Sequence, residues 1–506
     1  MARESNNIRQ FTALTVFSVS EKVIAYIYQA IIAAILGAGV VTDSFFAASQ
    51  LFDLIDSTVL GALVVVVINR YANISVEKDE HTGIVFLSKL NTLLTILMVT
   101  MAILTFLFAT PFSYLVAPGF DEISRPVLIR CIRILCIIPP IMVFATLAQG
   151  LLRQKKCFIV VNSRSLCISF CGIAVILAFS IHDPTNANVL CYGYVAANIL
   201  FSILLFIRSR RFGNIGLAKP SFDKDTRKVF ALAGPAIISK GIVRISLMID
   251  QIISSTLGKG SVSYLNYAHS LYNIVNSLLI VNLCIIMLTD FTNLCVKQQY
   301  NAMINKLNNA VSSIVLILAP VSLLTMCFSK EIVSIAYQRG AFGEESTDAV
   351  GSLLLFYAAG FIPAMLNSIH TQVLHSFGKM NVAMKNSIIS FGMNIFLSLI
   401  LSYAIGIAGI AIGTTVSASI AIVLYIKSVR ECLPGYKSVC DRGYIVKLLG
   451  GLIGCGIVVG VVKKFIKSYV LSFAIATILG LFVFGMILLL LKEKTLLGYL
   501  GKKRRG

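Results

Sequence analysis

The amino-acid sequence predicts an all-α polytopic membrane protein with fourteen transmembrane helices. Of its 506 residues, 57% are hydrophobic and only 13% are charged, whereas soluble proteins contain about 25% charged residues. The apolar segments reach about 20 residues, the length that a helix needs to cross a bilayer. Spans of a β-barrel would instead be alternating segments of about ten residues. The composition excludes a soluble multidomain enzyme, a disordered chain and a nucleic-acid-binding protein, despite a net charge of +21.

The fourteen predicted helices follow one another along the whole chain. The first contains Glu21 and Lys22 and is followed by no small-residue cleavage site, so we expect a retained helix rather than a signal peptide. The predicted spans lie near residues 11–36, 44–68, 90–115, 127–152, 158–181, 189–207, 229–257, 262–290, 307–328, 349–375, 387–406, 408–426, 445–462 and 470–491.

The distribution of Lys and Arg predicts the orientation of these helices. With the N-terminus in the cytoplasm, thirty of the 43 cations fall in cytoplasmic loops and tails, seven fall in outer loops and six remain inside spans. Cytoplasmic loops of membrane proteins are enriched in Lys and Arg. We therefore expect both termini in the cytoplasm. Most of the net positive charge is then explained by loop cations that orient the helices in the membrane.

An internal repeat at an offset of 221 residues predicts two related lobes. Residues 23–49 and 244–270 share nine of 27 positions, and Leu36-Gly37 and Gly39 match Leu257-Gly258 and Gly260. The offset covers six helices, so both copies have the same orientation. Paired lobes with a site between them are typical of secondary transporters. We expect an N-lobe at 1–207, a basic cytoplasmic linker at 208–228, a C-lobe at 229–430, and two further helices with a basic tail at 431–506.

Ionisable residues inside the spans are the candidate functional residues, because charge in the membrane is costly and usually faces a cavity or a partner. They lie on the first two helices of the first lobe and the first helix of the second: Lys22, Asp53, Asp56, Lys240, Arg244 and Asp250. We expect Lys22, Lys240 and Arg244 to bind an anionic head group such as a phosphate. The alternative is that the charges pair with one another.

The remaining residue patterns point away from catalysis. Arg130, Arg133 and Arg164 are expected at helix ends, at interfaces or in local pairs. The sequence contains no Walker loop, nucleophile elbow or metal-ligand cluster, and most of the twelve cysteines lie in apolar spans as small buried residues. We expect a transporter without catalytic residues, metal or cofactor, driven by an ion gradient or by the membrane potential.

Five sequence strings in order resemble the MurJ/MviN lipid II flippases, a branch of the superfamily that includes MATE drug exporters and polysaccharide flippases. The fourteen-helix count also fits MurJ better than MATE proteins, which usually have twelve. The strings are LGAGVVTDSFFAAS (Leu36–Ser49), APGF (Ala117–Phe120), GPAI (Gly234–Ile237), SVSYLNYAHSLY (Ser261–Tyr272) and RGAFGEESTD (Arg339–Asp348).

This resemblance implies a two-lobed flippase in the bacterial cytoplasmic membrane. It would move an undecaprenyl-pyrophosphate-linked peptidoglycan precursor from the inner to the outer leaflet by alternating access, with basic residues holding the diphosphate. A groove of helices 13 and 14 would guide the lipid tail. The implied partners are the lipid-linked glycan, membrane lipids and cell-wall synthesis proteins.

The sequence departs from the family pattern at the cavity. Family members commonly carry arginines on helices 1, 2 and 8, at the positions of Lys22, Tyr28, Asp56 and Ser270. Only Lys22 keeps the positive charge, and Asp56 reverses it. Lys240 and Arg244 are expected to compensate, and Asp53 completes the candidate cavity set.

The resemblance also implies a sodium site in the second lobe, at the positions of Asp250, Asn394, Ser398 and Thr414. Oxygen ligands of this kind suit a hard cation. The family pattern has a second acid where Ser398 stands. The alternative is that Asp250 pairs with Arg244 or Lys240.

Three other functions stay open. One is a flippase for another lipid-linked polysaccharide, and one is a MATE-like drug/cation antiporter, which Asp53 and Asp56 favour. The third is a non-transporting scaffold for wall synthesis, which the missing arginines favour.

Overall fold

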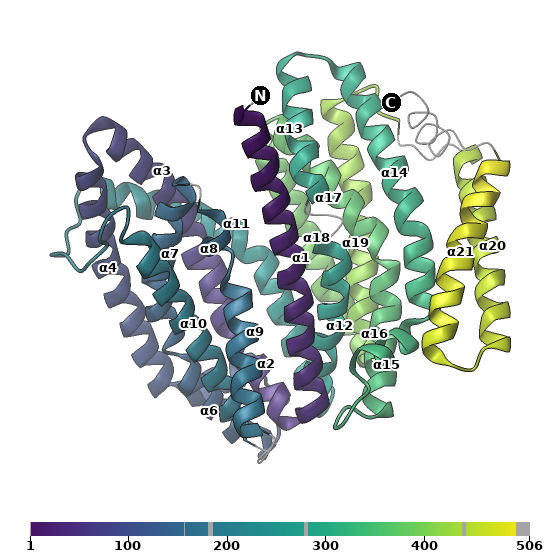
Figure 1. Cartoon of the computed structure of the whole chain (residues 1–506), viewed down its shortest axis with the longest axis horizontal. Helices are drawn as coiled ribbons and strands as arrows, with labels where there is room; N and C mark the ends of the chain where they lie inside the picture. Colours follow the sequence, from purple (N-terminus) through teal and green to yellow (C-terminus); the bar gives the residue numbers. More distant parts are fainter. Residues whose placement is uncertain (1, 156, 181–185, 278–281, 438–441, 492–506) are drawn as a thin grey trace. The chain divides into compact units, whose positions relative to one another are not determined.

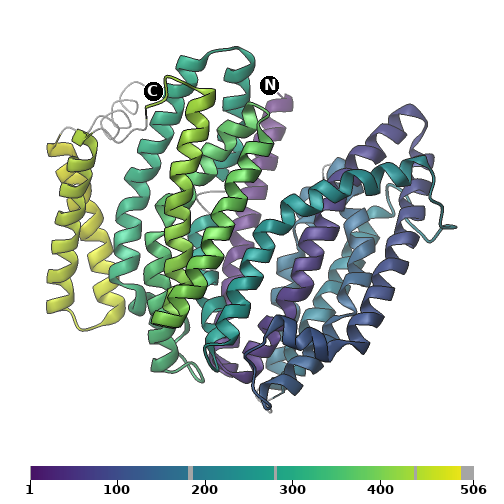
Figure 2. The same cartoon turned by 180° about the vertical axis from the view of Figure 1, so that it is seen from behind.

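The computed structural model describes residues 2–155, 157–180, 186–277, 282–437 and 442–491. Every regular element in these ranges is helical, which confirms the all-α prediction. The chain divides into two compact units (Figures 1 and 2). The N-terminal unit comprises Met1–Asn266 with Arg339–Gly343, and the C-terminal unit comprises Tyr267–Gln338 with Glu344–Gly506.

In the N-terminal unit, α7 lies beside α3, α4 and α10 (Figure 1). Two short π-helices, η1 and η2, interrupt the α-helices. The elements are α1 (Ala2–Leu36), α2 (Val40–Ile55), η1 (Asp56–Leu60), α3 (Gly61–Glu77), α4 (Glu80–Leu107), α5 (Ala109–Val116), α6 (Ser124–Leu135), α7 (Ile138–Gln154), α8 (Phe158–Val161), α9 (Arg164–Val175), η2 (Ile176–Ser180), α10 (Asn188–Ser209), α11 (Lys224–Ser255) and the first turns of α12 (Ser261–Asn276).

In the C-terminal unit, α20 and α21 form a hairpin that is yellow at the chain end in both views (Figures 1 and 2). Gly454 of α20 faces Ile487 of α21, which leaves no room for a larger residue, whereas Gly456 and Gly460 have open space. The first glycine therefore serves helix packing. The elements are α13 (Asn282–Val296), α14 (Tyr300–Cys327), α15 (Ser329–Tyr337), α16 (Glu344–Ala359), α17 (Phe361–Ser376), α18 (Met380–Ile405), α19 (Ala408–Cys432), α20 (Arg442–Phe465) and α21 (Tyr469–Leu490).

In the described part of the chain, each of the fourteen predicted spans falls on one of these helices or on consecutive ones. Within the described residues, ten helices are long and apolar enough to cross a membrane, and the bent pair α16–α17 makes an eleventh. The other three predicted spans fall on the short α9–η2, on the charged α11, and on α12–α13. The fourth predicted span is two helices, because Pro139 and Pro140 occupy the first turn of α7, where a missing N–H is tolerated.

The matching Leu-Gly-x-Gly strings of the two repeats, which the sequence predicts as a tight turn, form a turn in both copies. Gly37 has φ 65° and Gly258 has φ 111°, a region that side-chain-bearing residues rarely adopt. Ala341 N donates to Ala34 O at 2.8 Å, and a side chain on Gly37 would meet Ala341 O at 2.6 Å. This close approach holds Arg339–Gly343 in the N-terminal unit. Helix α11, which the repeat assigns to the second lobe, also packs in this unit on α3 and η1; the predicted lobe boundaries remain a prediction.

Contacts within the N-terminal unit join loops that the topology prediction places on the same side. On the predicted outer side, Lys259 lies 3.0 Å from Asp121. The backbone amide of Ser124, the Ser124 side chain and then Lys259 hold the pKa of the Asp121 carboxyl well below its usual range. On the opposite side three ion pairs join the loops: Arg70–Asp225, Lys89–Asp223 and Lys155–Glu80.

The Asp43 carboxylate fastens the start of α12 to α2. Asp43 is 2% exposed, and its oxygens accept hydrogen bonds from Gly260 N at 2.6 Å, Ser263 N at 2.8 Å and Ser263 Oγ at 2.5 Å. The first N–H groups of a helix lack partners within it, so Asp43 caps α12 from another helix. These bonds help to place the first turns of α12 in the N-terminal unit.

We predict that Asp43→Ala lowers the free energy of unfolding by about 2–3 kcal/mol, because it leaves buried N–H donors without an acceptor. The measurement is the melting of the purified protein in detergent. The control is Lys259→Ala, which breaks an exposed ion pair at the same end and should cost less than about 1 kcal/mol. Equal melting of the two variants would contradict the capping role.

Candidate functional site

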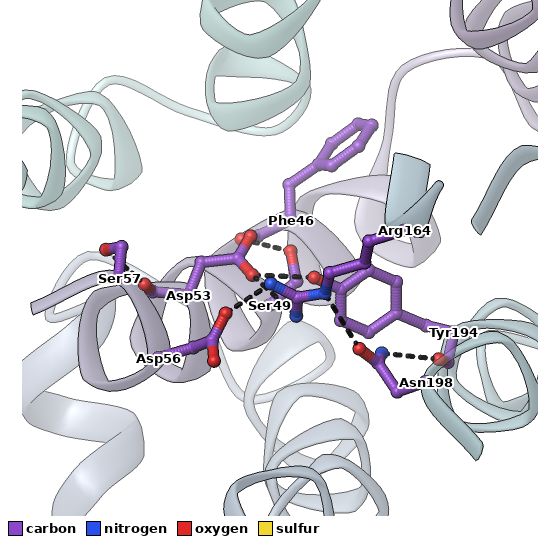
Figure 3. Close-up of polar contacts among 8 residues, drawn as sticks. All are labelled: Phe46, Ser49, Asp53, Asp56, Ser57, Arg164, Tyr194 and Asn198. Carbon is purple, nitrogen blue, oxygen red and sulfur yellow. Dashed lines mark hydrogen bonds and ion pairs between the residues drawn. The ribbon is translucent and has the colours of Figure 1, made fainter. Parts of the chain in front are cut away.

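Arg164 is the centre of a polar network inside the N-terminal unit (Figure 3). Its guanidinium pairs with Asp56 through Nη1 and lies 4.0 Å from Asp53 through Nη2. Arg164 Nε donates to Asn198 Oδ1 at 3.0 Å, and Tyr194 OH donates to Asp53 Oδ1 at 2.6 Å. Three transmembrane segments thus contribute to one site: α2–η1, α9 and α10.

The local sequence explains how these side chains meet. Asp53 and Asp56 are three residues apart, so they share one face of the helix. Tyr194 and Asn198 are four residues apart on α10, and Asn198 Nδ2 donates to Tyr194 O at 2.8 Å. At Asp56 the helix widens into the π-helical turn η1, a local feature that is frequent at functional sites.

The charges of this network are nearly balanced. The side chains of Asp56, Arg164 and Asp53 are 12%, 24% and 37% exposed. Arg164 compensates one of the two acids, and Arg244 lies within electrostatic range of Asp56. Gly241 of α11 packs against Thr58 of η1, which brings that helix to the network. An uncompensated charge inside a membrane protein is costly, and this pairing avoids most of that cost.

The predicted substrate cations differ in what surrounds them. Lys22 on α1 and Arg244 on α11 are exposed, and in the described part of the chain no ion pair involves either of them. The side chain of Lys240 lies outside the described residues. The partner of Asp53 and Asp56 in the described structure is Arg164 rather than Lys22.

Two further predicted cavity residues lie in different surroundings. Tyr28 is buried, and its ring fills the space above Gly172 of α9, where a larger residue could not fit. Its hydroxyl has no hydrogen-bond partner in the described structure. Ser270 lies half-buried on α12 in the C-terminal unit. Their substrate role stays a prediction.

The structure brings three of the four predicted cation ligands together. Asn394 Nδ2 lies 3.1 Å from Thr414 Oγ1 and 3.5 Å from Ser398 Oγ, all in the C-terminal unit. Asp250 is buried on α11 in the N-terminal unit. Among the described residues, no group of three His, Cys, Asp or Glu side chains could hold a metal ion.

Sequence reasoning found part of this site. It expected Arg164 at a helix end, at an interface or in a local pair, but it did not identify Asp53 and Asp56 as its partners, and it missed Tyr194 and Asn198. The i,i+4 spacing of these two residues on α10 was the available signal. Asp43 was also missed, although it is an acid within the apolar string of Leu36–Ser49.

We predict that Arg164→Ala destabilises the protein by about 3–5 kcal/mol, because it leaves the buried Asp56 without its cation. The double variant Arg164→Ala/Asp56→Ala should recover much of this loss. The measurement is the yield and melting temperature of the detergent-solubilised protein. Arg130→Ala is the matched control, because Arg130 is exposed on α6. A double variant that melts no higher than Arg164→Ala would contradict the pairing.

Comparison with known proteins places the chain in a family. A family model described as lipid II flippase MurJ matches residues 32–484. A probable lipid II flippase MurJ of Rickettsia prowazekii is 25% identical over 66% of this chain and 66% of the relative. That of Buchnera aphidicola subsp. Schizaphis graminum is 22% identical over 88% of this chain and 87% of the relative.

Solved structures show the same fold. The structure of lipid II flippase MurJ in an inward closed conformation has a TM-score of 0.81 at 18% identity, over 94% of this chain and 98% of that chain. An inward-facing MATE multidrug transporter of the MOP superfamily has a TM-score of 0.69 at 13% identity, over 84% of this chain and all of that chain. The chain is therefore an integral protein of the bacterial inner membrane, a transporter rather than an enzyme, and it belongs to the MurJ lipid II flippase family.

Proposed function

We propose that this protein moves lipid II, an undecaprenyl-pyrophosphate-linked peptidoglycan precursor, from the inner to the outer leaflet by alternating access. The match of the MurJ family model to residues 32–484 carries this proposal. Both termini lie in the cytoplasm in this proposal, as the 30 to 7 distribution of loop cations indicates. Cell-wall synthesis proteins are the expected protein partners.

Lys22 and Arg244 are the cations that we assign to the substrate's pyrophosphate. Arg164 is held by Asp53 and Asp56, so its charge is already compensated. Lys22 and Arg244 are exposed and carry no ion pair in the described structure. Lys and Arg side chains bind phosphate oxygens by charge-assisted hydrogen bonds. Lys240 joins them in the proposal through its i,i+4 spacing from Arg244 on α11.

The antiporter alternative loses support, because the acids that favoured it are the partners of Arg164. A flippase for another lipid-linked polysaccharide would use the same cations for the same pyrophosphate. A scaffold without transport would need none of them.

We predict that the protein restores growth to a bacterium depleted of its own lipid II flippase. Arg244→Ala should lower lipid II export about tenfold or more, since a charge-assisted contact contributes about 1.5–3 kcal/mol. Lys22→Ala and Lys240→Ala should act in the same direction. The measurement is the appearance of lipid II in the outer leaflet.

The control for this experiment is Lys259→Ala, a cation in a predicted outer loop. All variants must reach the membrane at equal amounts. Full lipid II export by all three cavity variants would contradict the assignment of these cations to the pyrophosphate. If the well-expressed wild type does not restore growth, another lipid-linked substrate or a scaffold function is favoured.

We also propose that transport is driven by a sodium gradient or by the membrane potential, with Asp250, Asn394, Ser398 and Thr414 as the cation ligands. The proximity of Asn394 and Thr414, 3.1 Å apart, supports the second-lobe part of this set. Oxygen-rich ligand sets suit hard cations.

We predict that Asp250→Asn removes the dependence of lipid II export on sodium or on the potential, because it removes the negative charge from the ligand set. Export should be compared in cells with and without a sodium gradient, and with the potential collapsed. Thr414→Val is a second variant that removes a ligand oxygen without changing charge. If both variants keep the driving-force dependence of the wild type, Asp250 is a structural residue.

A further inference from the structure

A cavity of about 330 Å³ opens between α3 and α11. Its lining residues are Val66, Asn69, Arg70, Asn73, Lys228, Val229 and Leu232. This volume is at the lower end of the range for small-molecule pockets. All of its walls belong to the N-terminal unit.

Each wall of the cavity is one face of a helix. The α3 residues are spaced i, i+3, i+4 and i+7 from Val66, and the α11 residues are spaced i, i+1 and i+4 from Lys228. Such spacings place side chains on one face. The cavity is therefore built by two regular helices rather than by a loop.

The cavity has an apolar part and a polar part. Val66 belongs to the apolar run of α3, which ends at Ile68, and Asn69, Arg70 and Asn73 lie beyond its end. Val229 and Leu232 add apolar wall from α11. The polar part carries two cations and two amides, and no acidic residue lines it. This arrangement suits an amphiphile with an anionic head.

The lining cations keep a positive excess. Asp225, which does not line the cavity, pairs with Arg70 and accepts from its Nε at 3.1 Å. Lys228 is exposed and has no ion pair in the described part of the chain. The N-terminal N–H groups of α11 are already used in part, because Asp223 accepts from Thr226 N at 2.9 Å. The net attraction for an anion therefore comes from Lys228, because Asp225 compensates the charge of Arg70.

The position of the cavity places it at a membrane surface. The Arg70–Asp225 and Lys89–Asp223 ion pairs join α3 and α4 to the start of α11, and these four residues fall in segments that the topology prediction places in the cytoplasm. We propose that this cavity binds the phosphate head group of an inner-leaflet lipid, with Lys228 on the phosphate and Val66, Val229 and Leu232 against the first apolar atoms. Basic pockets between membrane helices on the cytoplasmic side bind anionic head groups in this way.

Two lipids could supply this phosphate: a bulk anionic glycerophospholipid and a polyprenyl pyrophosphate. The test uses the purified full-length protein in a neutral detergent. Short-chain phosphatidylglycerol, short-chain phosphatidylcholine and undecaprenyl pyrophosphate are added in separate arms, and bound lipid is counted by native mass spectrometry.

We predict that Lys228→Ala weakens the binding of an anionic lipid about fivefold, the effect of one interfacial cation. Leu232→Trp should weaken it by a similar factor, because it fills the cavity without changing charge. Arg227→Ala is the matched control: it removes an exposed cation from the preceding position, outside the lining. It should change binding less than twofold.

The separate lipid additions show which of the two lipids supplies the phosphate. Loss of phosphatidylglycerol binding in both cavity variants supports the site and assigns it to bulk phospholipid. Loss of undecaprenyl pyrophosphate binding alone supports the site and assigns it to the substrate class. Equal effects of Lys228→Ala and Arg227→Ala, no effect of Leu232→Trp, or equal binding of phosphatidylcholine would overturn the proposal. Binding is read independently of export, so failure of the proposed flippase activity would leave this result intact.

Discussion

The absence of water in the bilayer core is the constraint on which the rest of the structure depends. A charge that enters this region needs a partner within the protein. Asp53 and Asp56 of α2–η1 meet this requirement through Arg164 of α9. From α10, Tyr194 donates a hydrogen bond to Asp53 and Asn198 accepts one from Arg164. Asp43 meets it differently, by accepting hydrogen bonds from the start of α12. Both solutions tie together helices that lie far apart in the sequence.

The sequence was sufficient to predict the helical fold, because span length and loop charge follow directly from the membrane. It also predicted the Gly37 and Gly258 turns, since the repeat places matching glycines where the chain adopts positive φ. It could not pair Asp56 with Arg164, which is 108 residues away, because pairing depends on how three helices pack. The cap formed by Asp43, which is 217 residues from Gly260, could not be predicted for the same reason. No sequence pattern predicted the π-helical turn at Asp56.

The cations of the membrane region differ in their surroundings. Arg164 is compensated and holds helices together. Lys22 and Arg244 are exposed without ion pairs in the described chain and are therefore available to a phosphate. At the predicted cytoplasmic surface, Arg70 and Lys228 line a cavity whose other wall is apolar. In our proposals, different basic residues therefore serve helix packing, substrate binding and lipid binding, and the cations of the predicted cytoplasmic loops orient the helices.

Our central claim is that Asp56 is the ion-pair partner of Arg164 and does not bind the substrate. The most direct test is an exchange of the two charges, Asp56→Arg with Arg164→Asp, which keeps the pair and returns a cation to the helix 2 position where the family commonly has arginine. The measurement is lipid II export by equal amounts of protein in flippase-depleted cells. The account predicts loss of folded protein in each single variant and recovery of both folding and export in the double variant. A functional Asp56→Arg single variant, or a double variant no better than either single one, would contradict it.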